Sequence, residues 1–328
     1  MVRALRISLA VALLALAGGL ASGGRAEPVV RAVGCLQLTV GSADRAAQFY
    51  VGVLSFKRVA EREVTDSGLA ELQSLPGLRA RIVRLALGLE CVELVEVRAP
   101  LGRAKPAGER SNDLSFQHMA IVVRDMDAAY AALRAAHVRQ VSSEPQRIPA
   151  SNRAAAGIRA FYFRDPDDHN LELIWFPEGK GAPRWQEPSE SLFLGIDHTA
   201  IAVSDTARSV SFYRDRLGLR VGGESENSGI EQERLNAVFA SRVHITGLRA
   251  AAGPGIELLE YLAPADGRPL PDDLRANDVA YWLTRLEVSG IDAVAPGAVA
   301  VDGAANGFRR GLVIRDPDGH ALRLEESP

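Results

Sequence analysis

Apolar and polar residues alternate in four short segments, and each segment opens a similar stretch of the chain. In the second segment, His118 and Ala120 fall on one face of a strand, while the bulkier Met119 and Ile121 fall on the other. We expect the bulky face to pack under a helix and the small-residue face to leave room for a ligand. The four segments span residues 35–40, 117–123, 197–203 and 278–283.

A helical pattern follows each of the first three strands. After the second strand, Met126, Tyr130 and Leu133 recur at helical spacing. In the fourth unit only about one turn of helix fits between Leu283 and Asp292. Each unit closes on another strand, at residues 91–97, 171–176, 256–261 and 321–325. The pattern therefore predicts an α+β fold of four β-α-β-β-β modules.

Two motifs repeat along the chain and divide it into similar halves. Phe49-Tyr50 is echoed by Phe212-Tyr213, and the Arg-Asp-Pro-Asp-x-His sequence at 164–169 recurs at 315–320. Asp-Pro-Asp is typical of a turn, because proline presets φ and aspartate accepts backbone hydrogen bonds. We expect a first domain at 32–176 (modules 1 and 2), a linker at 177–192 and a second domain at 193–326 (modules 3 and 4).

Composition places the chain among ordinary globular proteins. It has 328 residues, of which 47% are hydrophobic and 24% charged, and its 38 basic and 41 acidic residues give a net charge of −3. That length suits two domains. The mixed charges form no extended basic surface, so nucleic acid is not expected as a partner.

The N-terminal segment has the pattern of a secretory signal. Arg3 and Arg6 precede an apolar run at 7–20, and small residues follow up to Ala26. We expect a signal peptide at 1–26, a secreted or periplasmic mature protein and no membrane association after cleavage. An uncleaved membrane anchor is the alternative interpretation.

The modules resemble the vicinal oxygen chelate (VOC) superfamily over residues 32–326. The resemblance rests on His118 and His198 in opening strands, on the Asp-Pro-Asp-x-His turns, and on Glu172-Leu173 in a closing strand. The superfamily includes glyoxalase I, methylmalonyl-CoA epimerase, extradiol dioxygenases, and bleomycin and fosfomycin resistance proteins. The resemblance implies glyoxalase-like domains around a concave small-molecule site.

In this superfamily each module offers two metal ligands, one in its first strand and one in its last. Carried onto this sequence, the four pairs are Cys35 and Glu93, His118 and Glu172, His198 and Glu257, and Asp278 and Arg323. Arginine stays protonated and cannot bind a metal. An extradiol-type site, which would use His198, Asp278 and Arg323, is therefore broken.

The pairing of modules decides which ligands meet. If modules 2 and 3 pair, His118, Glu172, His198 and Glu257 form a complete set, and the first–fourth pair is broken. If modules pair within each half, Glu93, His118 and Glu172 form a three-ligand site. We favour the crossed pairing and leave the second open.

The resemblance implies chemistry on a small oxygen-bearing substrate. Two imidazoles and two carboxylates suit a divalent ion such as Ni, Zn, Fe, Co or Mn, and Glu172 or Glu257 would serve as catalytic base for lyase or isomerase proton transfer. An extradiol-type dioxygenase and a metal-free binding or resistance protein remain alternatives. The protein would act as a monomer or a homodimer.

The two cysteines of the chain are placed so that they could form a disulfide bond. Cys91 shares strand parity with Glu93, and Cys35 occupies the paired ligand position. We expect a Cys35–Cys91 disulfide, which an oxidising compartment would permit.

Overall fold

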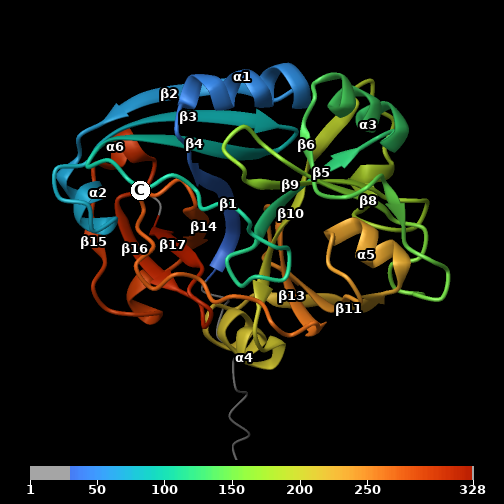
Figure 1. Ribbon diagram of the computed structural model, residues 1–328. Coiled ribbons are helices and arrows are strands. Elements are labelled where there is room, and N and C mark those ends of the chain that lie inside the picture. The colour runs from blue at the N-terminus through green and yellow to red at the C-terminus, as the bar shows by residue number, and fades with distance from the viewer. Residues whose placement is uncertain (1–29, 327–328) are drawn as a thin grey trace, which may run out of the picture.

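The computed structural model describes residues 30–326 and contains the four expected modules (Figure 1). Module 1 comprises β1 (Val30–Thr39), α1 (Ala43–Leu54), β2 (Lys57–Val64), α2 (Ser67–Leu72), β3 (Arg79–Leu87) and β4 (Glu90–Ala99). Module 2 comprises β5 (Gln117–Val123), α3 (Met126–Ala135), β6 (Arg139–Gln140), β7 (Gln146–Arg147), β8 (Arg159–Arg164) and β9 (Asn170–Trp175). The short helix η1 (Pro183–Gln186) follows.

The second half repeats this order. Module 3 comprises β10 (Phe193–Val203), α4 (Thr206–Val210), the π-helix η2 (Ser211–Arg216), β11 (Arg220–Ser228), α5 (Ile230–Asn236), β12 (Arg242–Arg249) and β13 (Gly255–Ala263). Module 4 comprises β14 (Trp282–Val288), η3 (Ile291–Ala293), β15 (Val299–Ala300), α6 (Gly303–Asn306), β16 (Arg310–Arg315) and β17 (Ala321–Glu326). The single turn η3 stands where the other modules have a longer helix, as predicted.

Each sheet combines one module from each half of the sequence. The first–fourth sheet has the order β15-β16-β17-β14-β1-β4-β3-β2, and the second–third sheet has the order β11-β12-β13-β10-β5-β9-β8-β6. The central strands of each sheet pair antiparallel, β1 with β14 and β5 with β10. The crossed pairing of modules is confirmed, and the within-half pairing is wrong.

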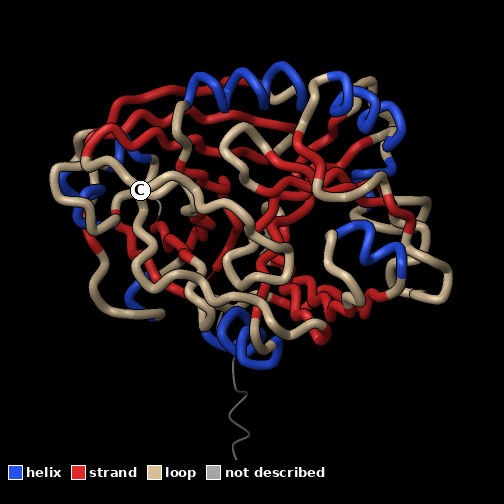
Figure 2. The backbone as a smooth tube through the Cα atoms, viewed as in Figure 1, coloured by secondary structure: helices blue, strands red, loops and turns tan. Residues whose placement is uncertain are grey.

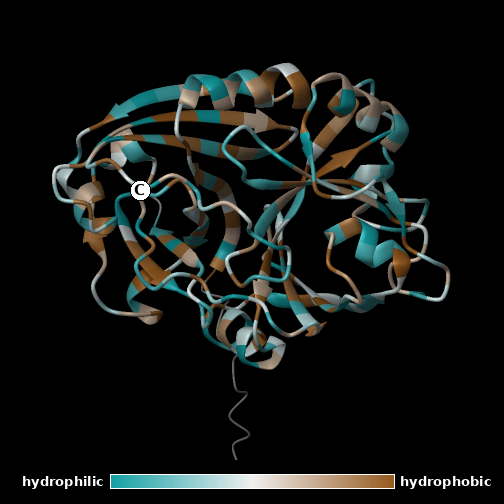
Figure 3. Cartoon of the chain, in the orientation of Figure 1, coloured by the Kyte–Doolittle hydropathy of each residue, from teal (hydrophilic) through white to brown (hydrophobic). Residues whose placement is uncertain are grey.

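Two hydrophobic clusters follow the sequence halves, and two others join modules within one sheet, the first with the fourth and the second with the third. One core joins the helix-bearing sides of modules 1 and 2 and includes Tyr50 and Met119, while another joins modules 3 and 4 and includes Tyr213 and Leu322. The longer helices α1 and α3 pack into the first of these clusters, whereas α2 and α5 pack into the clusters on the other faces of the sheets. Figure 2 shows the helices distributed around the two sheets, and bands of hydrophobic and hydrophilic residues alternate along the strands (Figure 3).

The two repeated motifs contact each other. Tyr50 Oη donates to Asp165 Oδ2 (3.1 Å), and the equivalent Tyr213 Oη donates to Asp316 Oδ2 (3.1 Å). His169 Nδ1 lies 2.9 Å from Asp165 Oδ2. The repeated turns thus have a structural role, in which they tie the helix of one module to the closing turn of the next.

One predicted strand was misplaced. The opening strand of module 4 runs from Trp282 to Val288, and Asp278 lies in the preceding loop. There the Asp278 carboxylate accepts hydrogen bonds from the backbone N–H groups of Arg103 and Arg275 and from the Arg103 guanidinium. Asp278 is therefore a loop-stabilising residue and cannot take the place of a strand ligand.

Candidate metal centre

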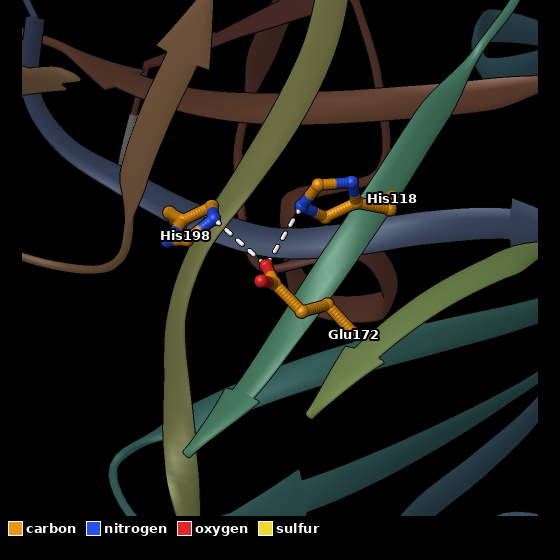
Figure 4. Close-up of side chains that lie close together, drawn as sticks. All are labelled: His118, Glu172 and His198. Atoms are coloured by element: carbon orange, nitrogen blue, oxygen red, sulfur yellow. Dashed lines mark ion pairs between the residues drawn. The ribbon is translucent and has the colours of Figure 1, made fainter. Parts of the chain in front are cut away.

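Three predicted ligands converge from three neighbouring strands of the second–third sheet. His118 lies on β5, Glu172 on β9 and His198 on β10 (Figure 4). Glu172 Oε2 is 3.1 Å from His118 Nε2 and 3.4 Å from His198 Nε2. One ligand atom of each side chain lies within 4.8 Å of the other two, and all three residues are buried.

The register of the strands brings these side chains together. Ala120 on β5 stands beside Glu172 in the parallel pair with β9, and opposite His198 in the antiparallel pair with β10. Because side chains alternate along a strand, His118, Glu172 and His198 share one face. Thr199 Oγ1 donates to the His118 carbonyl oxygen (2.8 Å) across the central strand pair.

The fourth predicted ligand, Glu257 on β13, lies outside this group of three and contacts it through His198. Its Oε2 atom is 3.3 Å from His198 Nε2, and its side chain is 26% exposed where that of Glu172 is only 6% exposed. Glu257 also lines an open cleft of about 950 Å³. Glu257 therefore connects the buried cluster, through His198, to a cleft that a small molecule can enter.

Among the described residues, both ring nitrogens of His118 and the Nε2 atom of His198 are buried without a hydrogen-bond partner. Nε2 of His118 and Nε2 of His198 both lie near Glu172, but neither forms a hydrogen bond of acceptable geometry within the described residues. An unpaired buried polar atom is costly. A divalent cation bound between the two imidazoles and the carboxylates would satisfy these atoms, so the donor set fits a metal ion.

The charges of the site also favour a cation. Burial by itself would raise the pKa of Glu172, but the close imidazoles outweigh it and lower that pKa to about 2. Burial likewise opposes the charged form of His198, yet the surrounding carboxylates, Glu257 foremost, raise its pKa to about 10. The same negative field would attract a metal ion in place of the proton.

A second layer of contacts orients His198. Its Nδ1 atom lies 3.0 Å from Asp197 Oδ2, which directs Nε2 into the site. Asp197 also accepts hydrogen bonds from Trp185 Nε1 (2.8 Å) and Arg249 Nη2 (2.8 Å). His118 is held differently, between the rings of Phe116 and Tyr162 at centroid distances of 5.6 and 4.9 Å.

Sequence reasoning missed Trp185 and Arg249. Trp185 lies in the predicted linker, which packs onto the small-residue face of the sheet beside Ala120 and Val122. Its neighbour Arg184 stacks on the Trp185 ring at 3.9 Å and pairs with Glu90 at 2.6 Å. A buried aromatic residue within a Gly- and Pro-rich segment is the signal that could have revealed this packing.

Comparison with known proteins identifies the family. Residues 32–173 and 195–324 match the family model of the Glyoxalase/Bleomycin resistance protein/Dioxygenase superfamily. The chain belongs to this superfamily. The two matched segments correspond to the two sequence halves, and the packed segment around Trp185 lies between them.

Individual members of the superfamily support this assignment. The chain is 33% identical over 174 residues to a 2-epi-5-epi-valiolone epimerase from Actinomyces sp, over 52% of this chain and 92% of that protein. Two mutants of glyoxalase I from Zea mays share its fold with TM-scores of 0.59. They are 14% and 15% identical to it and cover 90% of this chain and 92% and 94% of their own.

The first–fourth sheet departs from the superfamily pattern. Cys35, at the position of His118, forms a disulfide with Cys91 as predicted. In the second–third sheet, Ala120 stands beside both Glu172 and His198. The equivalent residue of the first–fourth sheet is Gln37, which stands beside Glu93 and Leu283. The counterpart of His198 is therefore Leu283, and the earlier choice of Asp278 was wrong.

Arginines fill the broken site. Glu93 pairs with Arg84 (2.7 Å) and Arg285 (3.0 Å), and Arg323, at the position of Glu257, pairs with Glu325 (2.6 Å). Burial alone would raise the pKa of the Glu93 carboxyl, but the neighbouring guanidinium groups lower it from 4.5 to about 2. Fixed cations thus stand where the other sheet has room for a metal ion.

This pKa shift predicts an acid-dependent stability. The contribution of Glu93 should be fully present above pH 4.5 and should be lost as the pH falls towards about 2. Glu93→Gln should lower the free energy of unfolding by about 3 kcal/mol at pH 7, because it removes a buried carboxylate and leaves Arg285 paired with Glu325 alone. Denaturant titrations between pH 7 and pH 2 would measure this, with the exposed Glu63→Gln as control. An equal loss in the control, or a difference that persists unchanged at pH 2, would contradict the assignment.

The orientation of His198 can be tested through Asp197. Asp197→Asn should weaken metal binding by about 10- to 100-fold, because it replaces the carboxylate that orients the imidazole. Trp185→Phe, which removes only one hydrogen bond to Asp197, should have a smaller effect. Competition with a chelating dye would give both affinities. If Asp197→Asn binds metal like the unaltered protein, His198 does not depend on this contact.

Proposed function

We propose that this protein is a metal-dependent isomerase of the epimerase type, which removes and returns a proton at a carbon next to a carbonyl group. The observation that carries the proposal is the cluster of His118, Glu172 and His198, which Glu257 contacts through His198 from the wall of the cleft. The 33% identity to an epimerase supports the reaction class.

Four residues would hold the metal: His118, Glu172, His198 and Glu257. Two nitrogen and two carboxylate donors suit Ni, Zn, Fe, Co or Mn. When bound, such a cation polarises a substrate carbonyl group and stabilises the negative charge that develops on its oxygen.

The two glutamates are suited to different roles. Glu172 is buried and contacts both imidazoles, so it can hold the ligand set in place. Glu257 lines the cleft. Of the three buried ligands, it contacts His198. We assign Glu257 as the base that takes the proton from carbon. Return of this proton to the same face restores the substrate. Protonation of the opposite face by a water molecule in the open cleft yields the epimer, and Glu257 then gives its proton to the hydroxide that remains.

We also propose that the protein is exported. The signal-like pattern at 1–26, which lies outside the described residues, supports this, as does the Cys35–Cys91 disulfide. Within residues 30–326, no helix combines the length and apolar character that a membrane crossing requires.

The test is proton exchange. Metal-loaded protein is incubated in D2O with a panel of α-hydroxy ketones, and NMR follows deuterium incorporation and inversion at the carbon next to the carbonyl group. We expect exchange that a chelator abolishes and added metal restores. Oxygen consumption with a catechol would instead favour a dioxygenase. Tight ligand binding without metal or exchange would favour a binding protein.

A further inference from the structure

The cleft above the candidate metal centre carries more acidic than basic side chains. Its ionisable lining consists of four carboxylates and two guanidiniums, namely Glu90, Asp197, Glu224, Glu257, Arg184 and Arg249. A bound divalent cation would not make the site positive, because Glu172 beneath adds another carboxylate. The cleft therefore offers no positive field to a substrate that carries a phosphate or carboxylate group.

Both arginines of the cleft are already paired with carboxylates. Arg249 donates to the carbonyl oxygen and to Oδ2 of Asp197, at 2.8 Å each. Arg184 donates from Nη1 to Glu90 Oε1 (2.6 Å), and Glu90 Oε2 in turn accepts the Ile196 backbone N–H (3.0 Å). These pairings neutralise the guanidinium charges without using all of their N–H groups.

Arg184 is held rigidly and remains accessible. It stacks on the Trp185 ring at 3.9 Å, and its side chain is 32% exposed where it lines the cleft. Within residues 30–326, its Nε and Nη2 atoms donate to no other group. The planar guanidinium of Arg184, with its charge balanced by Glu90, can donate hydrogen bonds to hydroxyl or carbonyl oxygens of an uncharged ligand.

The walls of the cleft point to the same ligand class. They are built largely from small residues, such as Gly222 and Gly223 at a bulge of the edge strand β11, and Gly247 on β12. None of the described lining residues is aromatic. The walls thus offer no stacking surface for a flat aromatic ring such as a catechol.

We infer that the cleft selects an uncharged, polyhydroxylated ketone or aldehyde, and that Arg184 determines this specificity by donating hydrogen bonds to substrate oxygens remote from the reacting carbon. The carbonyl group in this inference rests on the proposed function. The absence of charge and the hydroxyl groups rest on the cleft itself.

Calorimetric titration of the metal-loaded protein with matched probes tests the inference. The probes are D-xylulose, D-xylulose 5-phosphate and catechol. We expect D-xylulose to bind at least about tenfold more tightly than its phosphate ester, since the phosphate would enter a net negative cleft. Catechol should bind more weakly than D-xylulose. Tighter binding of either the phosphate ester or catechol would overturn the inference.

Variants of Arg184 separate hydrogen bonding from charge. Arg184→Met should weaken D-xylulose binding about tenfold, with metal content unchanged. Arg184→Lys, which keeps the charge but lacks the planar fork, should also lose affinity. The exposed Arg214→Met is the matched control and should bind like the unaltered protein. Full retention of affinity in Arg184→Met would overturn the role of Arg184.

Failure of this inference differs from failure of the proposed function. If the protein holds metal through His118 and His198 but binds no D-xylulose, the substrate class is wrong and the metal centre stands. If D-xylulose binds in an Arg184-dependent way to protein that takes up no metal, the isomerase proposal fails and the specificity of the cleft stands.

Discussion

His118→Ala is expected to purify without bound metal, whereas the unaltered protein should hold about one divalent ion per chain. The variant removes one of the two imidazoles whose Nε2 atoms lie unpartnered at the centre of the site. Loss of a direct ligand should lower the metal affinity by more than the roughly 100-fold that follows from loss of an orienting contact. Plasma mass spectrometry on purified, metal-reconstituted protein measures the content.

Matched variants make this result specific. His198→Ala should lose metal equally, because it supplies the other imidazole from the partner module. His137→Ala, which alters an exposed histidine, should retain the full content. Two ions per chain would show that the first–fourth sheet also binds metal, despite its disulfide and its Arg323. Retention of metal in His118→Ala would move the site away from these strands.

Glu257→Gln is expected to lower proton exchange by about 100- to 10,000-fold, the usual contribution of a positioned general base. The amide keeps an oxygen that can face the metal, so most of the metal content should remain. Glu172→Gln should act differently and lose the metal itself, because Glu172 contacts both imidazoles inside the site.

The comparison of the two variants assigns the roles. Exchange rates and metal content are measured on the same preparations, with the exposed Glu226→Gln as control. If Glu257→Gln loses metal while Glu172→Gln keeps it but stops exchange, the two roles are reversed. If both variants exchange normally, neither carboxylate is the base.

Local pattern was enough to predict the modules and most of the site residues. Alternation along a strand has a period of two, so it already placed His118 and Ala120 on one face and Met119 on the other. The same parity predicted the Cys35–Cys91 disulfide, which the structure confirms. Each of these relations spans one strand or two neighbouring strands of one module.

The pairing of modules was decided only by the tertiary structure. β5 lies beside β10 and β1 lies beside β14, so that each pair joins modules from the two halves of the sequence. Alternation within a strand carries no information about which distant strand will lie beside it. For this reason the sequence left two ligand sets open. The fourth opening strand was misplaced for another reason, since Asp278 accepts hydrogen bonds from loop residues Arg103 and Arg275 that the alternation pattern does not reveal.

The surroundings of the site likewise depended on long-range packing. Arg249 reaches Asp197 from another strand, and Trp185 reaches it from a segment that had only the composition of a linker. The sequence by itself determined the four-module fold and the residues that can bind a metal. Only the tertiary structure decided which of them meet and how the cleft above them is charged, because those properties arise from side chains that strand register and packing bring together.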